Sequence, residues 1–475
     1  MEPEELAEAL VRLQAWAYAH QPKRESPVRA RLTEHLGEDL SGMEVLSHDI
    51  TPYDHVNLQV ALDALAAGGT ELDLLGLGLE RGFQVSLAEL ARSGGPFDEE
   101  WAPGPPRYHP VDVGDRTISC LTSGLLFTRH EGQPVAALLA PGDDGPRHGG
   151  LSLQAMAPQR STAEAWLAEL RASMQRHNVY RGKVLAFGGS HPFEPAPLTV
   201  RALPEVRRDR NVLPADTLAR IERHTAGFAR HADALRAGGR HIRRGLLLHG
   251  PPGTGKTLSI MYLAGLMPDR TVVLITGRSL GAIGAAADLA RSLAPAMVVV
   301  EDVDLIARDR RAHETTPLLF ELLNAMDGLD EDADIIFALT TNRPEVLEPA
   351  LASRPGRIDL AVELPLPDPD ARRRLLELYG EGLALDVADW GPVVAATEGT
   401  SPAFIRELLR HAALGAAESG APAVDAAQLL DAVGRLKHDA GRLTAALLGA
   451  ERPSAPPEED EDDGEESGWS PAPAW

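Results

Sequence analysis

Short apolar runs alternate with stretches of helical periodicity between residues 213 and 366. The runs are rich in β-branched and aliphatic side chains and cover residues 245–249, 271–275, 297–300, 335–339 and 360–364. Continuous apolar strands that alternate with helices are typical of a parallel sheet covered on both faces. The pattern predicts an α/β domain over residues 208–367.

The pattern before this domain changes twice. Residues 1–93 have mainly helical periodicity, with Leu6, Leu10 and Leu13 at spacings of four and three. A Gly/Pro-rich break then leads into residues 107–203, where strand patterns dominate. One helix is predicted there, at residues 161–177, opened by a capping box of Ser161 and Glu164. We interpret residues 107–203 as an α+β module and as a candidate for partner recognition.

The pattern after the α/β domain is helical. Residues 368–449 show only helical patterns, which predicts a separate helical domain. Residues 451–475 hold nine acidic residues, one arginine and several prolines. Like charges at this density repel one another, and too few apolar side chains remain to form a core, so we expect a disordered acidic tail.

Composition narrows the range of partners. The net charge of −24 argues against a general affinity for nucleic acid or anionic lipid. Cys120 is the only cysteine, which excludes an intrachain disulfide and fits a reducing compartment. No apolar run approaches 18 residues, and the first residues are acidic where a signal peptide would be basic. We therefore expect a cytoplasmic protein without a transmembrane segment.

A glycine-rich segment with the sequence GPPGTGKT, residues 250–257, follows the run 245–249 and precedes a helical stretch. It matches the phosphate-loop pattern G-x-x-x-x-G-K-[ST], which needs a strand before it and a helix after it. The glycines let backbone N–H groups approach phosphate oxygens, Lys256 brings a cation to the β- and γ-phosphates, and the Thr257 hydroxyl can ligate Mg²⁺. Lysine is rare in this chain, with four among 46 basic residues, so a lysine at this position is informative.

Polar residues end two of the later strands. The run 297–300 leads into Glu301 and Asp302, as a Walker B element requires, where one carboxylate reaches Mg²⁺ and the other activates water. The run 335–339 leads to Asn342, whose amide can hold the water or the γ-phosphate. Arg354 and Arg357 offer two guanidinium groups for the charge on a transferring phosphoryl group.

Together these motifs resemble the AAA family of ATPases over residues 208–445. The resemblance rests on GPPGTGKT, on LLNAMDGL at 322–329, on Thr340-Thr341-Asn342 and on SRPGRID at 353–359. It implies a P-loop NTPase sheet with a C-terminal helical lid, ATP hydrolysis with Mg²⁺, and a homo-oligomeric ring expected to be a hexamer. The nucleotide-binding residues expected from it are Gly250, Pro251, Pro252, Gly253, Thr254, Gly255, Lys256, Thr257 and Leu258. By resemblance Thr257 and Glu301 hold the metal, Asp302 and Glu301 are catalytic, Asn342 is the first sensor, and Arg354 is the arginine finger with Arg357 as its partner.

The sequence departs from the family pattern at three points. The acids of the Walker B element stand in the order Glu301-Asp302, which puts the shorter acid at the water-activating position. The segment between residues 277 and 295 is short and lacks the aromatic residue of threading motors. Both features are similar to the AAA branch that contains the mitochondrial complex III assembly chaperone. Pro402 also replaces the usual glycine of the second sensor.

Two functions follow from this reading. The leading hypothesis is an ATP-hydrolysing ring that remodels or assembles a protein partner recognised by residues 1–200. The alternative is a nucleotide-dependent scaffold or switch with little turnover. The sequence identifies no protein substrate.

Overall fold

The computed structural model describes most of the chain. The described residues are 26–37, 39–77, 85–92, 102–142, 150–189, 196–304, 333–345 and 357–439, with 9, 12, 13, 16, 322 and 324–326. The chain divides into two compact units: unit 1 is Met1–Arg208, Asp216–His249 and Thr257–Val362, and unit 2 is Asp209–Ala215, Gly250–Lys256 and Glu363–Trp475. Arg354 and the predicted acidic tail lie outside the described residues.

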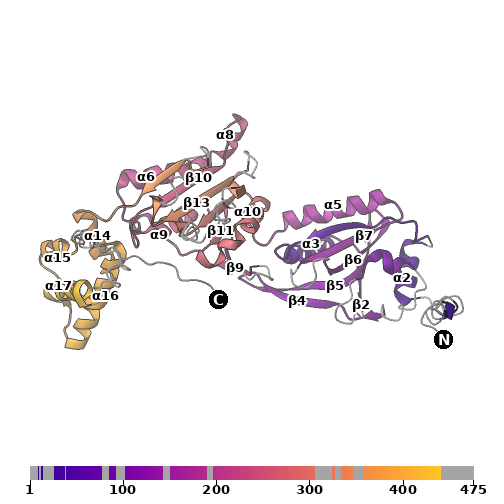
Figure 1. Ribbon diagram of the computed structural model, residues 1–475, viewed down its shortest axis with the longest axis horizontal. Helices are drawn as coiled ribbons and strands as arrows, with labels where there is room; N and C mark the ends of the chain where they lie inside the picture. Colours follow the sequence, from indigo (N-terminus) through magenta and orange to yellow (C-terminus); the bar gives the residue numbers. More distant parts are fainter. Residues whose placement is uncertain are drawn as a thin grey trace, which may run out of the picture. The chain divides into compact units, whose positions relative to one another are not determined.

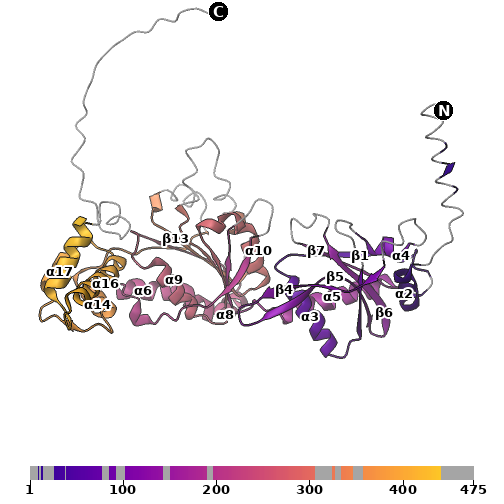
Figure 2. The ribbon, with the colours of Figure 1, turned by 90° about the horizontal axis from the view of Figure 1, so that it is seen from below.

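Unit 1 begins with a seven-stranded sheet of antiparallel pairs. Its strand order is β1 (Leu46–Ile50), β7 (Leu151–Met156), β6 (Gln133–Pro141), β5 (Thr117–His130), β2 (Leu72–Leu77) and β3 (Pro103–Gly104), and β4 (Arg107–Asp112) also pairs with β5. Helices α3 (His55–Ala67) and α5 (Arg160–Arg176) pack on one face, and α2 (Pro27–Leu36) and α4 (Leu87–Ala91) on the other (Figures 1 and 2).

Strand β6 shows why both faces are covered. Val135, Ala137 and Leu139 belong to the core beneath α3 and α5, whereas Ala136, Leu138 and Ala140 belong to the core beneath α2 and α4. Successive side chains of a strand point to opposite faces, so an uninterrupted apolar run supplies two cores at once.

Two expectations for this region are corrected. Residues 1–93 do not form a separate helical region, because β1 and β2 lie in the same sheet as β5 to β7 and a boundary at residue 93 would separate strands that pair. The predicted capping box is also wrong. Helix α5 begins at Arg160 with no side-chain cap, and Glu164 pairs with Arg160 at 2.8 Å instead. Ser161 therefore lies inside the first turn, where it cannot act as the N-cap.

The second sheet of unit 1 is the predicted α/β sheet. Its order is β14 (Leu360–Glu363), β10 (Arg244–His249), β13 (Ile335–Thr341), β12 (Ala296–Val300), β11 (Thr271–Ile275), β8 (Val184–Phe187) and β9 (Leu198–Arg201). The pairs from β10 to β8 are parallel. Every residue of β12 and β13 is buried, as expected for central strands of a doubly covered sheet. Helices α9 (Lys256–Gly265) and α10 (Ile283–Ser292) follow β10 and β11 in the chain (Figure 1).

The sheet order places a topological switch point at β10. Among the strands from residue 244 onward, β10 comes first in the sequence and is followed by β11, β12 and β13, yet β10 pairs with β13, and β14 lies on its other side. Ligands of open α/β sheets bind at the carboxyl ends of strands beside such a switch point. Strands β8 and β9 also join this sheet, although the sequence pattern assigned them to the module 107–203, because β8 pairs with β11.

Unit 2 contains the predicted helical domain. Its helices are α14 (Pro369–Tyr379), α15 (Gly391–Ala396), α16 (Pro402–Ser419) and α17 (Ala426–Gly434), with a short pair of β15 (Leu385–Asp386) and β16 (Val424–Asp425). Asp368, Ser401 and Asp425 cap the N-termini of α14, α16 and α17 through side-chain oxygens. Leu376, Phe404 and Leu408 are fully buried in the core of this unit.

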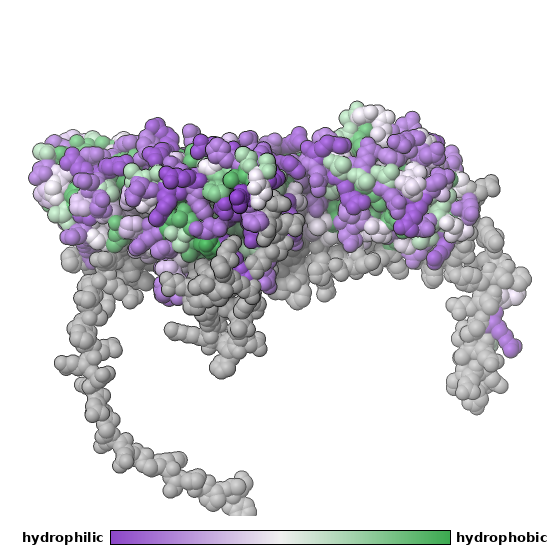
Figure 3. Space-filling model, turned by 90° about the horizontal axis from the view of Figure 1, so that it is seen from above, coloured by the Kyte–Doolittle hydropathy of each residue, from purple (hydrophilic) through white to green (hydrophobic). Residues whose placement is uncertain are grey.

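The surface is mixed in character. Figure 3 shows a mostly hydrophilic face on which hydrophobic residues gather in small separate patches. Within the described part of the chain, no helix is long and apolar enough to cross a membrane.

Candidate functional site

The glycine-rich segment forms the connection that the sequence predicts. Residues 250–255 follow β10 directly, and Lys256 begins α9. Gly250, Gly253 and Gly255 adopt φ angles of +142°, +78° and +97°. Side chains rarely occupy this region, so the loop's path depends on glycine at these positions.

Lys256 is oriented by the loop itself. Its Nζ donates to the carbonyl oxygens of Gly250 and Pro251 at 2.9 and 2.8 Å, and the side chain is buried. Thr254 braces the same turn by donating from its hydroxyl to Pro251 O at 2.9 Å. Thr257 follows at the surface and Leu258 is half-buried. A buried ammonium in a glycine loop that leads into a helix start is an anion-binding arrangement.

Within unit 2 this loop also touches the start of α16. Ala403 N donates to Gly253 O at 3.2 Å. A Cβ at position 253 would lie 2.8 Å from both Ala403 Cβ and Ser401 Oγ, so only glycine fits. Residues 398–403, the segment that resembles the second sensor, therefore contact the phosphate loop through backbone and small side chains, and Pro402 lies in the first turn of α16.

Lys437 hydrogen-bonds to the backbone at the start of the same segment. Its Nζ donates to Ala396 O at 2.9 Å and to Glu398 O at 3.4 Å. Burial lowers the pKa of Lys437 below its ordinary value, while the nearby Glu398 partly opposes the shift. The sequence pattern gave no sign of this contact, because the two segments are separated by a whole helix pair.

The acids after β12 lie at the carboxyl edge of the sheet, beside the end of β13. Asp302 has a φ angle of +52°, a left-handed conformation that is uncommon outside glycine. Two neighbours hold it: Asp302 N donates to Thr340 Oγ1 at 3.0 Å, and Asn342 Nδ2 donates to Asp302 Oδ1 at 3.1 Å. The structure thus brings together Asp302 and Asn342, which are 40 residues apart.

Glu301 carries a buried oxygen with an unused acceptor site. Its Oε1 is shielded from solvent and has no hydrogen-bond partner among the residues that the structure describes. Buried polar groups are normally satisfied, so a carboxylate oxygen with spare acceptor capacity at a strand end is suited to hold Mg²⁺ or a water of its shell. The Thr257 hydroxyl, which the sequence assigns to the same metal, is likewise a hard oxygen donor of the kind that magnesium prefers.

The predicted arginines differ in what the structure shows. Arg354 lies outside the described residues. Arg357 is buried, with 3% of its surface exposed. Its carbonyl oxygen packs against Gly245, where a Cβ would approach it to 1.9 Å. The backbone at Arg357 thus lies against the start of β10.

Asp304, Thr340 and Thr341 are the residues whose contacts the motif reading missed. All three are buried at the same edge of the sheet and hydrogen-bond across the ends of β12 and β13. The acidic run and the Thr-Thr-Asn segment indicated polar strand ends, but not which of their residues hydrogen-bond to one another.

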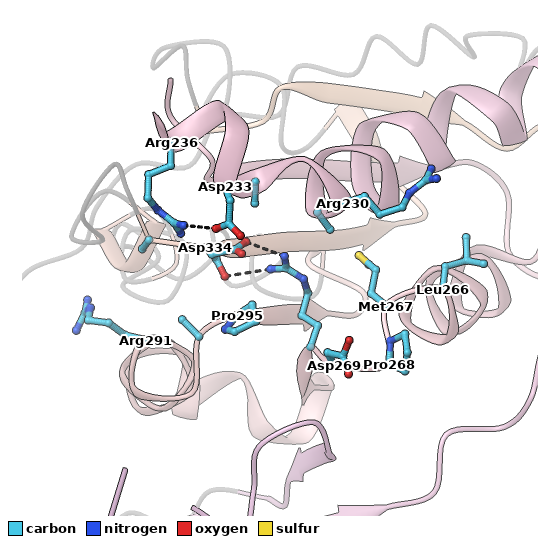
Figure 4. A pocket seen from close by; sticks show the side chains of 15 residues that line it. Arg230, Asp233, Arg236, Leu266, Met267, Pro268, Asp269, Arg291, Pro295 and Asp334 are labelled. Carbon is cyan, nitrogen blue, oxygen red and sulfur yellow. Dashed lines mark hydrogen bonds and ion pairs between the residues drawn. The ribbon is translucent and has the colours of Figure 1, made fainter. Parts of the chain in front are cut away.

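A hollow of about 650 Å³ lies at the opposite edge of this sheet (Figure 4). It is lined by residues that precede the strands, including Arg270, Pro295 and Asp334. Arg270 pairs with Asp334 at 2.7 Å and donates to Ala296 O, so this charge pair fastens the amino ends of β11, β12 and β13. The hollow lies away from the strand ends that carry the candidate chemistry.

Comparison with known proteins identifies relatives of this region. Residues 246–366 match the family described as "ATPase family associated with various cellular activities (AAA)". The chain is 34% identical over 242 residues to an ATP-dependent zinc metalloprotease FtsH 1 of Methylacidiphilum infernorum, covering 47% of this chain and 38% of that protein. It is 34% identical over 268 residues to an ATP-dependent zinc metalloprotease FtsH of Thermobaculum terrenum, covering 52% of this chain and 40% of that protein. The chain thus spans less than half the length of these curated relatives.

The described residues contain no group of three or more His, Cys, Asp or Glu side chains that could hold a metal ion.

Proposed function

We propose that this chain, which belongs to the AAA family of ATPases through residues 246–366, binds ATP with Mg²⁺ and hydrolyses it. The observation that carries the proposal is the contact of Asn342 Nδ2 with Asp302 Oδ1 at the carboxyl edge of the sheet. It joins a carboxylate and an amide at strand ends where open α/β sheets bind ligands.

Each residue of the candidate site has its own role in the proposed phosphoryl transfer. The phosphate loop and Lys256 would hold the β- and γ-phosphates, and Thr257 and Glu301 would hold Mg²⁺, which neutralises charge on the phosphate oxygens. The attacking water forms a bond to the γ-phosphorus while the bond to the β–γ bridging oxygen breaks. Asp302 accepts the proton that the water loses, and the bridging oxygen leaves on ADP.

Asn342 keeps Asp302 in place for this step. Its amide donates to Oδ1 of the carboxylate, so Oδ2 would be the oxygen that takes the proton from water. The positive φ of Asp302 turns the side chain away from the path that a continuing strand would give it. Backbone conformations of this kind cluster at functional sites, because the surrounding contacts hold them there.

A ring and a protein partner extend the proposal. The family resemblance implies a homo-oligomeric ring, expected to be a hexamer, in which Arg354 reaches a neighbour's nucleotide with Arg357 as its partner. The sheet module formed by β1 to β7 is the candidate surface for a protein substrate that the ring remodels or assembles.

Paired substitutions of the two acids test the proposal. Asp302→Asn keeps the shape of the side chain, and asparagine tolerates a left-handed backbone. We expect it to retain ATP binding and to slow hydrolysis by at least ~10²-fold, the scale of losing a general base. Glu301→Gln should instead raise the Mg²⁺ concentration needed for half-maximal activity.

Turnover by Asp302→Asn at the wild-type rate would show that another group takes the proton. Steady turnover of the wild type that a partner stimulates favours the remodelling ring. Assembly driven by ATP with negligible turnover favours the alternative of a nucleotide-dependent scaffold.

A further inference from the structure

Asp304 is a buried acid that the proposed reaction does not use. It lies two residues after Asp302 and has 3% of its surface exposed. Its Oδ1 accepts two hydrogen bonds, from Thr341 Oγ1 at 3.1 Å and from the backbone N–H of Asn342 at 3.2 Å. One carboxylate oxygen thus ties the end of β13 to the segment that follows β12.

The Thr341 hydroxyl links this contact to the next residue. It accepts the backbone N–H of Arg343 at 3.0 Å while donating to Asp304. Since a hydroxyl has one proton, this arrangement requires an acceptor at position 304. The backbone on both sides of Asn342 is therefore held by the pair of Asp304 and Thr341, and Thr341 is fully buried.

Asn342 in turn holds Asp302. The chain of contacts runs from Asp304 to the Asn342 backbone, and from the Asn342 amide to Asp302 Oδ1. The Thr340 hydroxyl fixes the other end of Asp302 through its backbone N–H. Asp302 and Asn342, the proposed water-activating pair, are thus positioned by the buried side chains of Thr340 and Asp304.

We propose that Asp304 is a positioning residue for ATP hydrolysis, which acts by fixing the backbone of Asn342 so that its amide orients Asp302. The inference rests on the proposed function. Asp304 is not assigned to the metal, because its Oδ1 already accepts two donors and its side chain is buried. What position 304 must supply is an acceptor oxygen, and its negative charge is dispensable.

Replacement by asparagine should therefore have different effects at Asp304 and at Asp302. The amide oxygen of asparagine accepts the same two hydrogen bonds but cannot take a proton from water. Asp304→Asn should keep kcat within about threefold of the wild type, whereas Asp304→Ala should lower kcat by about 10- to 100-fold, the scale of a small misplacement of a catalytic group. The dissociation constant for ATP should change little in either variant. Asp302→Asn should lose hydrolysis despite the same change of atoms.

Asp334→Ala is the matched control. Asp334 is also an acid fastening β13, but it pairs with Arg270 at the amino end of the strand. Its removal should lower thermal stability and leave kcat per folded molecule unchanged, which separates a general loss of support from misplacement of Asn342.

The experiment measures kcat, KM and ATP binding by calorimetry for the full chain and these variants. Thr341→Val, which keeps the size but removes the hydroxyl, should lower kcat in the same way as Asp304→Ala and serves if that variant does not fold. Wild-type kcat in Asp304→Ala or Thr341→Val would overturn the inference, as would an Asp304→Asn variant as slow as Asp302→Asn. A wild type that neither binds nor hydrolyses ATP would instead refute the proposed function.

Discussion

Gly253→Ala tests the contact between the phosphate loop and the start of α16. The new Cβ would sit at a φ of +78° and 2.8 Å from Ala403 Cβ and Ser401 Oγ. A left-handed alanine costs about 1–2 kcal/mol, and forcing an extra carbon into a packed site adds about 1–3 kcal/mol. We therefore expect a total of about 2–5 kcal/mol within unit 2.

Gly420→Ala separates the two contributions. Gly420 ends α16 at a φ of +68°, and no atom of the described residues lies within 4 Å of its added Cβ. Only the backbone cost of about 1–2 kcal/mol should remain there. The pair of variants thus compares the same change in side chain with and without a neighbour.

Hydrogen exchange of the amides in the first turn of α16 measures this directly, since it reports local opening. Gly253→Ala should speed exchange there by about 30-fold or more. This factor corresponds to a loss of about 2 kcal/mol, since each factor of ten in an equilibrium constant corresponds to about 1.4 kcal/mol. Gly420→Ala should leave the first turn unchanged and affect the last turn. Exchange at the start of α16 that is as slow in Gly253→Ala as in the wild type would refute the contact.

Two further predictions concern the ring and the thiol. Arg354→Ala should bind ATP normally and hydrolyse it poorly. Mixing it with Asp302→Asn subunits should restore activity at interfaces that pair an intact Arg354 with an intact Asp302. A wild-type protein that light scattering shows to be strictly monomeric, yet that hydrolyses ATP at its full rate, would contradict this. Burial raises the pKa of Cys120 from 9.0 to about 11, so at pH 8 the folded protein should react with a thiol reagent about 100-fold more slowly than the protein in denaturant. The folded state also holds this proton more tightly, so the contribution of Cys120 to stability is present below pH 9 and declines as the pH rises to about 11; equal reaction rates in the two states would contradict the shift.

The strands of the α/β sheet were predictable because each is an uninterrupted apolar run. Residues 271–275 match β11, and the predicted runs 297–300 and 335–339 lie within β12 and β13. Strands β1 and β2 were missed because each is half-exposed and only a few residues long. Their short alternation is lost beside the longer helical periodicity of α2 and α3.

The pairing of strands that are distant in the chain could not be predicted from the sequence either. Nothing local in β8 indicates that it pairs with β11 rather than with the strands just before it, because the partner lies almost 90 residues away. The same holds at the site. The motifs named Asp302 and Asn342, whereas the buried contact of Asp304 with Thr341 and the Asn342 backbone follows only from the register of β12 against β13.

The central claim is that this chain binds and hydrolyses ATP through its phosphate loop. The most direct test is calorimetric binding of ATP with Mg²⁺, together with phosphate release, for the wild type, Lys256→Ala and Lys23→Ala. Lys256 is the buried ammonium of the loop, so its removal takes away a charge-assisted contact to the β- and γ-phosphates. We predict tight binding and phosphate release by the wild type and by Lys23→Ala, whose lysine lies far from the phosphate loop in the sequence and outside the described residues, and loss of both in Lys256→Ala. Unchanged ATP affinity in Lys256→Ala would contradict it.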